Sequence, residues 1–169
     1  MRRATKYGIL CLCLLLALAA CTSSLSERAI PATVEATMSP KAVEELFTAQ
    51  LRDAGLNITS MGEATQPFLR GHGSRLRLNG GSLATPAELT IYCYTDVAIA
   101  AEDAGRVQPD TTIKWSEPDG NVKTISYAWV APPHFFRRDT TFVLYTGNDN
   151  AVLAVLTDIL GPQFAGRPE

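Results

Sequence analysis

The chain has 169 residues, 46% of them hydrophobic, with 15 basic and 17 acidic side chains and a formal net charge of −2. Nucleic-acid binding needs a concentrated positive footprint, so this balance excludes nucleic acid as an expected partner. The length is enough for one domain with a real hydrophobic core, for which about 130 residues suffice.

The first twenty residues are typical of an export signal. Arg2, Arg3 and Lys6 precede an apolar run at 9–18, which is too short to span a membrane as a mature helix. Small residues then lead into Cys21. Loss of the three basic residues with the signal would leave 12 basic against 17 acidic side chains and a net charge of −5. We therefore expect an acidic exported protein.

The segment Leu18-Ala19-Ala20-Cys21 resembles the lipobox of bacterial lipoproteins. The resemblance implies that the Cys21 sulfur receives a diacylglyceryl group and that cleavage makes this cysteine the new N-terminus. We expect residues 1–20 to be a removed signal peptide and 21–39 a lipidated N-terminus with a flexible tether. The expected location is outside the cytoplasm, lipid-anchored to the cell membrane or outer membrane. A conventional secretory signal with an incidental cysteine, or an uncleaved anchor, is the alternative.

Residues 40–169 predict a single α+β domain. Apolar periodicity, helix caps and turn residues indicate three helices and several strands. We expect two layers, with a mainly antiparallel sheet and about three helices packed on one face. The predicted helices are 40–54, 97–104 and 151–160, and the predicted strands are 56–61, 75–78, 88–94, 113–115, 123–131 and 141–145.

Catalytic chemistry has little support in the residue pattern. Cys93 is the one cysteine left after the signal and Cys21, and its phase with Leu89 and Ile91 predicts a core position. His72 and His134 lack the companions that a zinc site needs. Nucleotide-binding loops and serine-nucleophile motifs are missing from the sequence. We expect no cofactor, no metal and no enzymatic activity.

The stretch from Trp129 to Arg138 is the most unusual after the signal. It combines aromatic rings, a proline pair and arginines, which are residue types of interaction hot spots. One hypothesis is an interaction surface; the alternative is a hairpin whose phenylalanines cover the sheet edge beside solvated arginines. The residues of this hypothetical surface are Trp129, His134, Phe135, Phe136, Arg137 and Arg138.

Four further segments are similar to a recurrent type of small, uncharacterised bacterial lipoprotein, which implies no activity. We expect a membrane-anchored envelope lipoprotein that acts as a non-enzymatic binding or accessory module. Its partners would be the membrane, through the Cys21 lipid, and an envelope protein or cell-wall component. Alternatives are a small hydrolase or redox protein using Cys93 or His134, and an inhibitor of an envelope enzyme. The four segments are Leu78-Asn79-Gly80, Tyr94-Thr95-Asp96, Pro133-His134-Phe135-Phe136 and 144–149.

Overall fold

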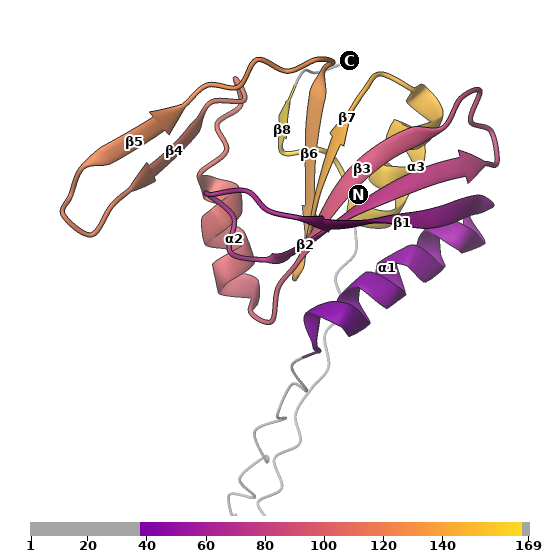
Figure 1. Ribbon diagram of the computed structural model, residues 1–169, viewed down its shortest axis with the longest axis horizontal. Helices are drawn as coiled ribbons and strands as arrows, with labels where there is room; N and C mark the ends of the chain where they lie inside the picture. The colour runs from indigo at the N-terminus through magenta and orange to yellow at the C-terminus, as the bar shows by residue number, and fades with distance from the viewer. Residues whose placement is uncertain (1–37, 167–169) are drawn as a thin grey trace, which may run out of the picture. The chain divides into compact units, whose positions relative to one another are not determined.

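The computed structural model describes residues 38–166 (Figure 1). The expected signal peptide, Cys21 and most of the tether lie outside the described residues. Three helices and eight strands follow one another in the described part, which confirms the predicted α+β class. They are α1 (Pro40–Asp53), β1 (Leu56–Ala64), β2 (His72–Gly80), β3 (Ala87–Cys93), α2 (Val97–Gly105), β4 (Ile113–Ser116), β5 (Val122–Ile125), β6 (Pro133–Arg138), β7 (Thr141–Thr146), α3 (Asn150–Leu160) and β8 (Ala165–Gly166).

Six strands form one sheet in the order β1-β2-β3-β7-β6-β8, with every neighbouring pair antiparallel. The centre of the sheet joins β3 to β7, so the two halves of the chain meet there. β4 and β5 form a separate two-stranded sheet. Figure 1 shows this hairpin standing away from the main sheet, beyond α2.

Local sequence explains where α1 begins and ends. The Ser39 hydroxyl accepts a hydrogen bond from the Ala42 N–H over 3.2 Å, and Pro40 suits the first helical position. Gly55 follows the helix with φ of 86°, a backbone conformation that glycine adopts without strain. Helix α2 starts in the same way, since the Asp96 carboxylate accepts from the N–H groups of Ala98 and Ile99. These starts confirm the first residues predicted for both helices, and each helix ends within one residue of its predicted end.

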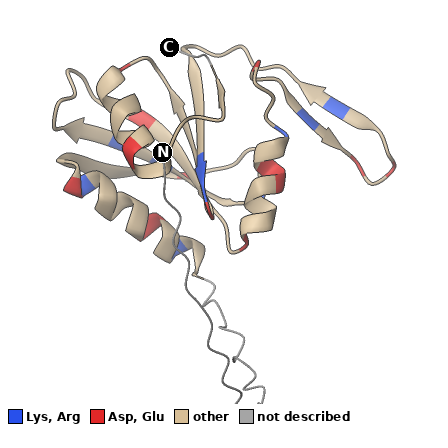
Figure 2. Cartoon of the chain, turned by 180° about the vertical axis from the view of Figure 1, so that it is seen from behind, with Lys and Arg blue, Asp and Glu red and all other residues tan. Residues whose placement is uncertain are grey.

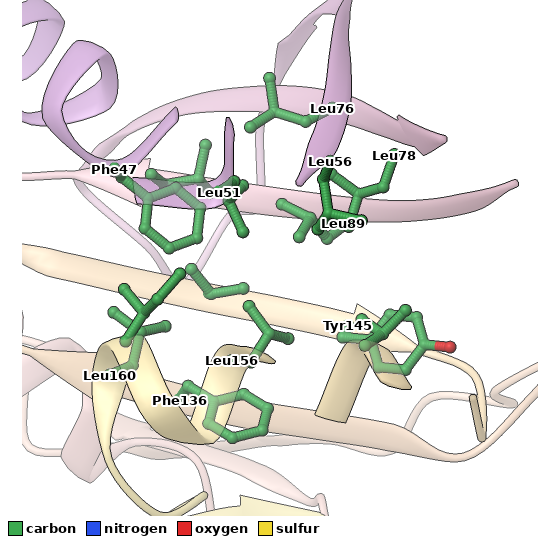
Figure 3. Close-up of a cluster of buried hydrophobic side chains, with 14 of the residues drawn as sticks. Phe47, Leu51, Leu56, Leu76, Leu78, Leu89, Phe136, Tyr145, Leu156 and Leu160 are labelled. Atoms are coloured by element: carbon green, nitrogen blue, oxygen red, sulfur yellow. The ribbon is translucent and has the colours of Figure 1, made fainter. Parts of the chain in front are cut away.

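The helices divide between the two faces of the sheet, which corrects the expected packing of all three on one face. α1 and α3 cover one face through Phe47, Leu51 and Leu156 (Figure 3). α2 covers the opposite face with Ala100 and Ala104. The physical reason is the central strand β3, which buries apolar side chains on both sides: Leu89, Ile91 and Cys93 on the first face, and Tyr92 and Tyr94 on the second.

Strand β6 is the main element that the sequence analysis missed. We predicted a strand at 123–131 and none at 133–138, but β5 ends at Ile125 and Pro133 begins β6. All six residues of β6 pair with β7, from Pro133 opposite Thr146 to Arg138 opposite Thr141. Proline is tolerated as the first residue of a strand, where its missing N–H does least damage. Residues 126–132 therefore connect the hairpin to the sheet.

Candidate functional site

The predicted interaction surface does not form one surface. Phe135 and Phe136 are 0% and 1% exposed and point to opposite faces of the sheet. His134 is also buried, at 3% exposed. The reason is that core clusters cover both faces of the sheet at β6, so consecutive side chains of this strand enter the core. This part of the hypothesis is corrected, and the two phenylalanines are core residues rather than an edge cover.

His134 has a defined set of neighbours inside the fold. Its Nδ1 lies 2.6 Å from Oε1 of Gln163, and its ring stacks on Tyr145 with the centroids 6.0 Å apart. Nε2 has no hydrogen-bond partner among residues 38–166. A buried ring held by a glutamine and a tyrosine supports the packing of β6.

The two arginines at the end of β6 differ. Arg138 donates from Nη1 to the carbonyl oxygen of Ile159 over 2.8 Å. A cation at the last turn of α3 also complements the helix dipole. Arg137 is half-buried beside it. Arg138 therefore has a structural role in holding α3 to the sheet.

Trp129, the remaining residue of the predicted interaction surface, lies at a different site. It is half-buried and lines a cavity of about 670 Å³ at the base of the β4–β5 hairpin. The cavity is bounded by the turn before β4, the connection between β5 and β6, and Gly166 of β8. Its lining residues are Pro109, Asp110, Thr111, Tyr127, Trp129, Val130, Ala131, Pro132, Pro133 and Gly166. We call it the hairpin-base cavity.

Two aromatic rings form one wall of the hairpin-base cavity. The rings of Tyr127 and Trp129 lie with centroids 5.2 Å apart. Behind them, Phe68 packs on Tyr127 and Phe135 packs edge-on against Trp129, at 6.0 Å and 5.9 Å. The aromatic wall is thus continuous with the core on the α2 face, which holds the rings in place.

The cavity wall also contains a strained residue, which contacts Trp129 directly. Thr111 has φ of 67°, and positive φ is a genuine outlier for a β-branched residue. It closes a tight turn in which its N–H donates to the Gln108 carbonyl and the Gln108 N–H donates to the Thr112 carbonyl. The Thr111 hydroxyl accepts a hydrogen bond from Nε1 of Trp129 over 3.2 Å. The contact with Trp129 joins segments that are separate in the sequence, so no local pattern predicts it.

Asp110 supplies the charge of the hairpin-base cavity. Its Oδ1 accepts from the Thr112 N–H over 3.0 Å. Hydrogen bonds from the Thr112 side chain and backbone hold the pKa of this exposed carboxyl below its ordinary value. None of the ten lining residues is lysine, arginine or histidine. The cavity therefore presents a carboxylate without a basic side chain in its walls.

A second polar cluster lies on α2 and is fully satisfied within the fold. The Asp103 carboxylate, 0% exposed, accepts from the backbone N–H and Nε of Arg70, at 2.7 and 2.8 Å, and from the Tyr94 hydroxyl at 3.0 Å. Arg106 approaches it to 3.2 Å, and Glu102 joins both arginines from the outside. The cluster pins α2 to the loop before β2, which is a structural task.

The Cys93 thiol lies in the core of the domain. Cys93 is 1% exposed, and burial raises the pKa of its thiol to about 12. Such a thiol stays protonated at neutral pH, whereas a nucleophile must be a thiolate. Across the described part of the chain, no three histidine, cysteine, aspartate or glutamate side chains are grouped to hold a metal ion.

Charge is distributed without a dominant patch. Figure 2 shows acidic and basic segments on several elements, with acidic residues on each of the three helices. A larger depression of about 920 Å³ runs beside α3, but its one aromatic lining residue, Phe136, is buried. The hairpin-base cavity thus differs in combining half-exposed rings, a strained residue and an uncompensated charge.

Comparisons with protein families, curated proteins and solved structures gave no match for this chain. Among the helices of residues 38–166, none has the length and apolar character to cross a membrane.

Proposed function

We propose that this protein is a lipid-anchored envelope lipoprotein whose folded domain is a non-enzymatic binding module, with the hairpin-base cavity as its ligand site. The sequence of the first 21 residues supports the anchor, because it has the order of an export signal followed by a lipobox-like cysteine. The acidic balance after the signal speaks against a general electrostatic grip on anionic lipid, so the lipid on Cys21 would supply the membrane attachment.

The observation that carries the binding role is the cavity itself. Ligand sites are concave, contain aromatic side chains and have a few placed polar groups. The hairpin-base cavity has Trp129 and Tyr127 as its aromatic wall and Asp110 as its charged group. Val130, on its rim, is 99% exposed, which is unusual for an apolar residue and leaves the entrance open to a partner.

Both specific catalytic alternatives are weakened by the placement of their residues. The buried, protonated Cys93 thiol speaks against a redox or nucleophilic role at neutral pH. The His134 side chain is 3% exposed and its ring stacks on Tyr145, so a substrate would have to displace the surrounding side chains to reach it. An inhibitor of an envelope enzyme would use the same exposed cavity, and its target would then be the captured partner.

The anchor is tested separately from the cavity. Labelled-lipid incorporation in a bacterial host should occur in the wild type and disappear in Cys21→Ser. Arg28→Ser, in the expected tether, is the matched control and should keep the label. Equal labelling of wild type and Cys21→Ser would contradict the lipoprotein assignment without affecting the cavity.

The cavity is tested by a photo-crosslinking amino acid placed at Val130 in the native host. Leu46 on α1 is the control position, because it is also an exposed apolar residue, at 55%, and lies outside the cavity. We expect a discrete adduct from Val130 and none from Leu46, with Val130 adducts reduced by Trp129→Ala. Equal adducts at both positions, or none at Val130, would contradict the assignment of the cavity as the ligand site.

A further inference from the structure

We propose that the hairpin-base cavity binds an organic ammonium group, with the rings of Trp129 and Tyr127 as its aromatic wall and the Asp110 carboxylate as its counter-charge. This inference rests on the proposed function and names the ligand class of that site. The ammonium could be a free amine or the side chain of a lysine, since the recognised chemistry is the same.

The cavity walls offer few free hydrogen-bond donors, so they favour a ligand that donates hydrogen bonds over one that accepts them. The two aromatic donors are already used: Trp129 donates to Thr111, and the Tyr127 hydroxyl donates to Oε1 of Gln66 over 3.2 Å. Three of the ten lining residues are prolines, which have no backbone N–H. An anion would find few donors here and a carboxylate to repel it.

The charge of the cavity also favours a cationic ligand. A carboxylate has about four lone-pair sites, and the bonds from Thr112 leave the Asp110 carboxylate with room for a further donor. Within residues 38–166 no basic side chain forms an ion pair with Asp110, although Lys114 lies close enough to exert a weak field on it. A cationic ligand would complete the missing pair.

The aromatic wall supplies the second part of ammonium recognition. A cation placed over the face of tryptophan or tyrosine within about 6 Å of the ring centre is attracted by the ring quadrupole. Trp129 and Tyr127 are adjacent, with their planes 38° apart, so together they form an angled surface rather than a single flat plate. Both rings also present an apolar face to the carbon atoms next to the charged nitrogen.

The strained backbone of Thr111 helps to hold Trp129 in place in the cavity wall. Positive φ in a non-glycine residue is strained and persists where the surroundings fix it. Thr111 is fixed by its own turn and by the indole of Trp129. This contact sets the position of the tryptophan next to the charged residue Asp110. A glycine would fill the turn without strain but would leave the indole unbonded.

The test uses the fact that the chain contains two tryptophans, Trp115 and Trp129. In the full-length Trp115→Phe protein, fluorescence reports on Trp129 alone; in Trp129→Phe, it reports on Trp115 in the hairpin. The ammonium probes are cadaverine and Nα-acetyl-lysine methylamide, whose charged nitrogens carry N–H donors. The lysine probe with an acetylated side-chain nitrogen is the neutral control, acetate is the anion control and N-acetylglucosamine is the sugar control.

We expect a saturable change in Trp129 fluorescence with ammonium probes and none with the acetylated lysine. Asp110→Asn should weaken binding about fivefold, the change that an exposed charge pair supports. Asp119→Asn is the matched control, because Asp119 is also exposed and accepts from a backbone N–H two residues on, but it lies in the β4–β5 turn. It should leave the affinity unchanged. Preference for the lysine probe over cadaverine would identify a polypeptide source, and the reverse a free amine.

Four outcomes would overturn the inference. A Trp129 response to the sugar or to acetate, without a response to ammonium, would show a cavity of a different specificity. Equal weakening by Asp110→Asn and Asp119→Asn would remove the role of Asp110. A discrete Val130 adduct in the host together with no ammonium binding would reject the ligand class alone, whereas the absence of both would reject the cavity as a site.

Discussion

The indole Nε1 of Trp129 donates a hydrogen bond to the hydroxyl of Thr111, and this 3.2 Å contact joins two segments on either side of the β4–β5 hairpin. A two-stranded hairpin alone is marginally stable in water. The contact ties the entry of the hairpin to its exit, so it fixes the hairpin base and the cavity wall together.

Thr111→Gly should separate the stability of the turn from the order of the cavity. The substitution relieves the positive φ but loses a hydrogen bond of about 1 kcal/mol and adds backbone entropy to the unfolded chain, about 0.4–1 kcal/mol. We expect the free energy of unfolding to change by less than about 1 kcal/mol, because these contributions oppose the relief of about 1–3 kcal/mol. Acrylamide quenching of Trp129, measured in the Trp115→Phe background, should rise as the indole loses its partner.

Asp139→Gly is the matched control for that experiment. Asp139 is the other non-glycine residue with positive φ among those described, at 50°, and it lies in the tight turn between β6 and β7. Its replacement should leave Trp129 quenching unchanged. If both glycine variants altered quenching alike, the effect would arise from general loosening rather than from the contact of Thr111 with Trp129.

The buried carboxylate of Asp103 should contribute far more to the free energy of unfolding than the exposed carboxylate of Glu102 beside it. Removing one partner of a buried ion pair typically costs about 3–5 kcal/mol, and Arg70 is partly exposed, so Asp103→Asn should lower the free energy of unfolding by about 3 kcal/mol. Urea unfolding followed by circular dichroism measures the change.

Glu102→Gln provides the comparison on the same helix. Glu102 contacts the same two arginines, but its side chain is 61% exposed. Water and salt screen exposed ion pairs, so Glu102→Gln should lower the free energy of unfolding far less than Asp103→Asn does. Equal losses in Asp103→Asn and Glu102→Gln would mean that the buried position carries no special weight and that α2 is held by apolar contacts alone.

The two leucines of α1 test the orientation of that helix. Leu51 is 0% exposed in the core, whereas Leu46 is 55% exposed. Leu51→Ala should destabilise the protein by about 2–5 kcal/mol through loss of burial and a residual cavity. Leu46→Ala should change stability by no more than about 0.5 kcal/mol, as an exposed substitution does. Similar losses in thermal or urea unfolding for the two variants would contradict the placement of α1 on the sheet.

The buried Cys93 thiol predicts a loss of stability at alkaline pH. Its pKa rises from 9.0 to about 12 because burial disfavours the thiolate, so above pH 9 the folded state keeps a proton that the unfolded state releases. Stability should therefore fall as pH rises above 9, by up to about 1.4 kcal/mol per pH unit from this group.

Cys93→Ala should remove that contribution. The clearest window is pH 9 to 10, because the buried hydroxyls of Tyr92 and Tyr94, whose pKa values burial also raises, start to contribute only from 10.0 upwards. Urea unfolding at several pH values gives the slope for each variant. Identical slopes in wild type and Cys93→Ala between pH 9 and 10 would show that the thiol is not shielded from water.

Local patterns were sufficient for much of the fold. The caps of α1 and α2 and the alternation of β3 could be read directly, since a capping side chain and a two-residue period act over a few neighbouring residues. Cys93 was correctly assigned to the core because Leu89 and Ile91 share its phase. These features depend on short-range geometry, which is set by neighbouring residues and does not require tertiary contacts.

Strand β6 could not be recognised in the same way. Its segment begins with a proline and ends with two arginines, and its apolar residues are consecutive rather than alternating. Consecutive apolar residues suit a strand that is buried on both faces. The sequence of this segment alone does not show that both faces of the sheet are covered, so it does not identify the segment as a strand. On the second face, Phe135 joins the core cluster that includes α2, and its ring contacts Trp129, Phe142 and Phe164. On the first face, α3 packs against β6, and Phe136 belongs to the same core cluster. The interaction surface predicted there therefore became part of the core.

The sequence by itself determined an α+β domain with capped helices, a buried thiol and a lipobox-like start. Tertiary structure alone decided that α2 packs opposite the other helices and that Trp129 belongs to a cavity rather than to an exposed patch. The cavity is built from 109–111, 127–133 and Gly166, which lie far apart along the chain. Its geometry depends on contacts between these segments, such as the bond from Trp129 to strained Thr111, and such contacts leave no periodic signal in the sequence.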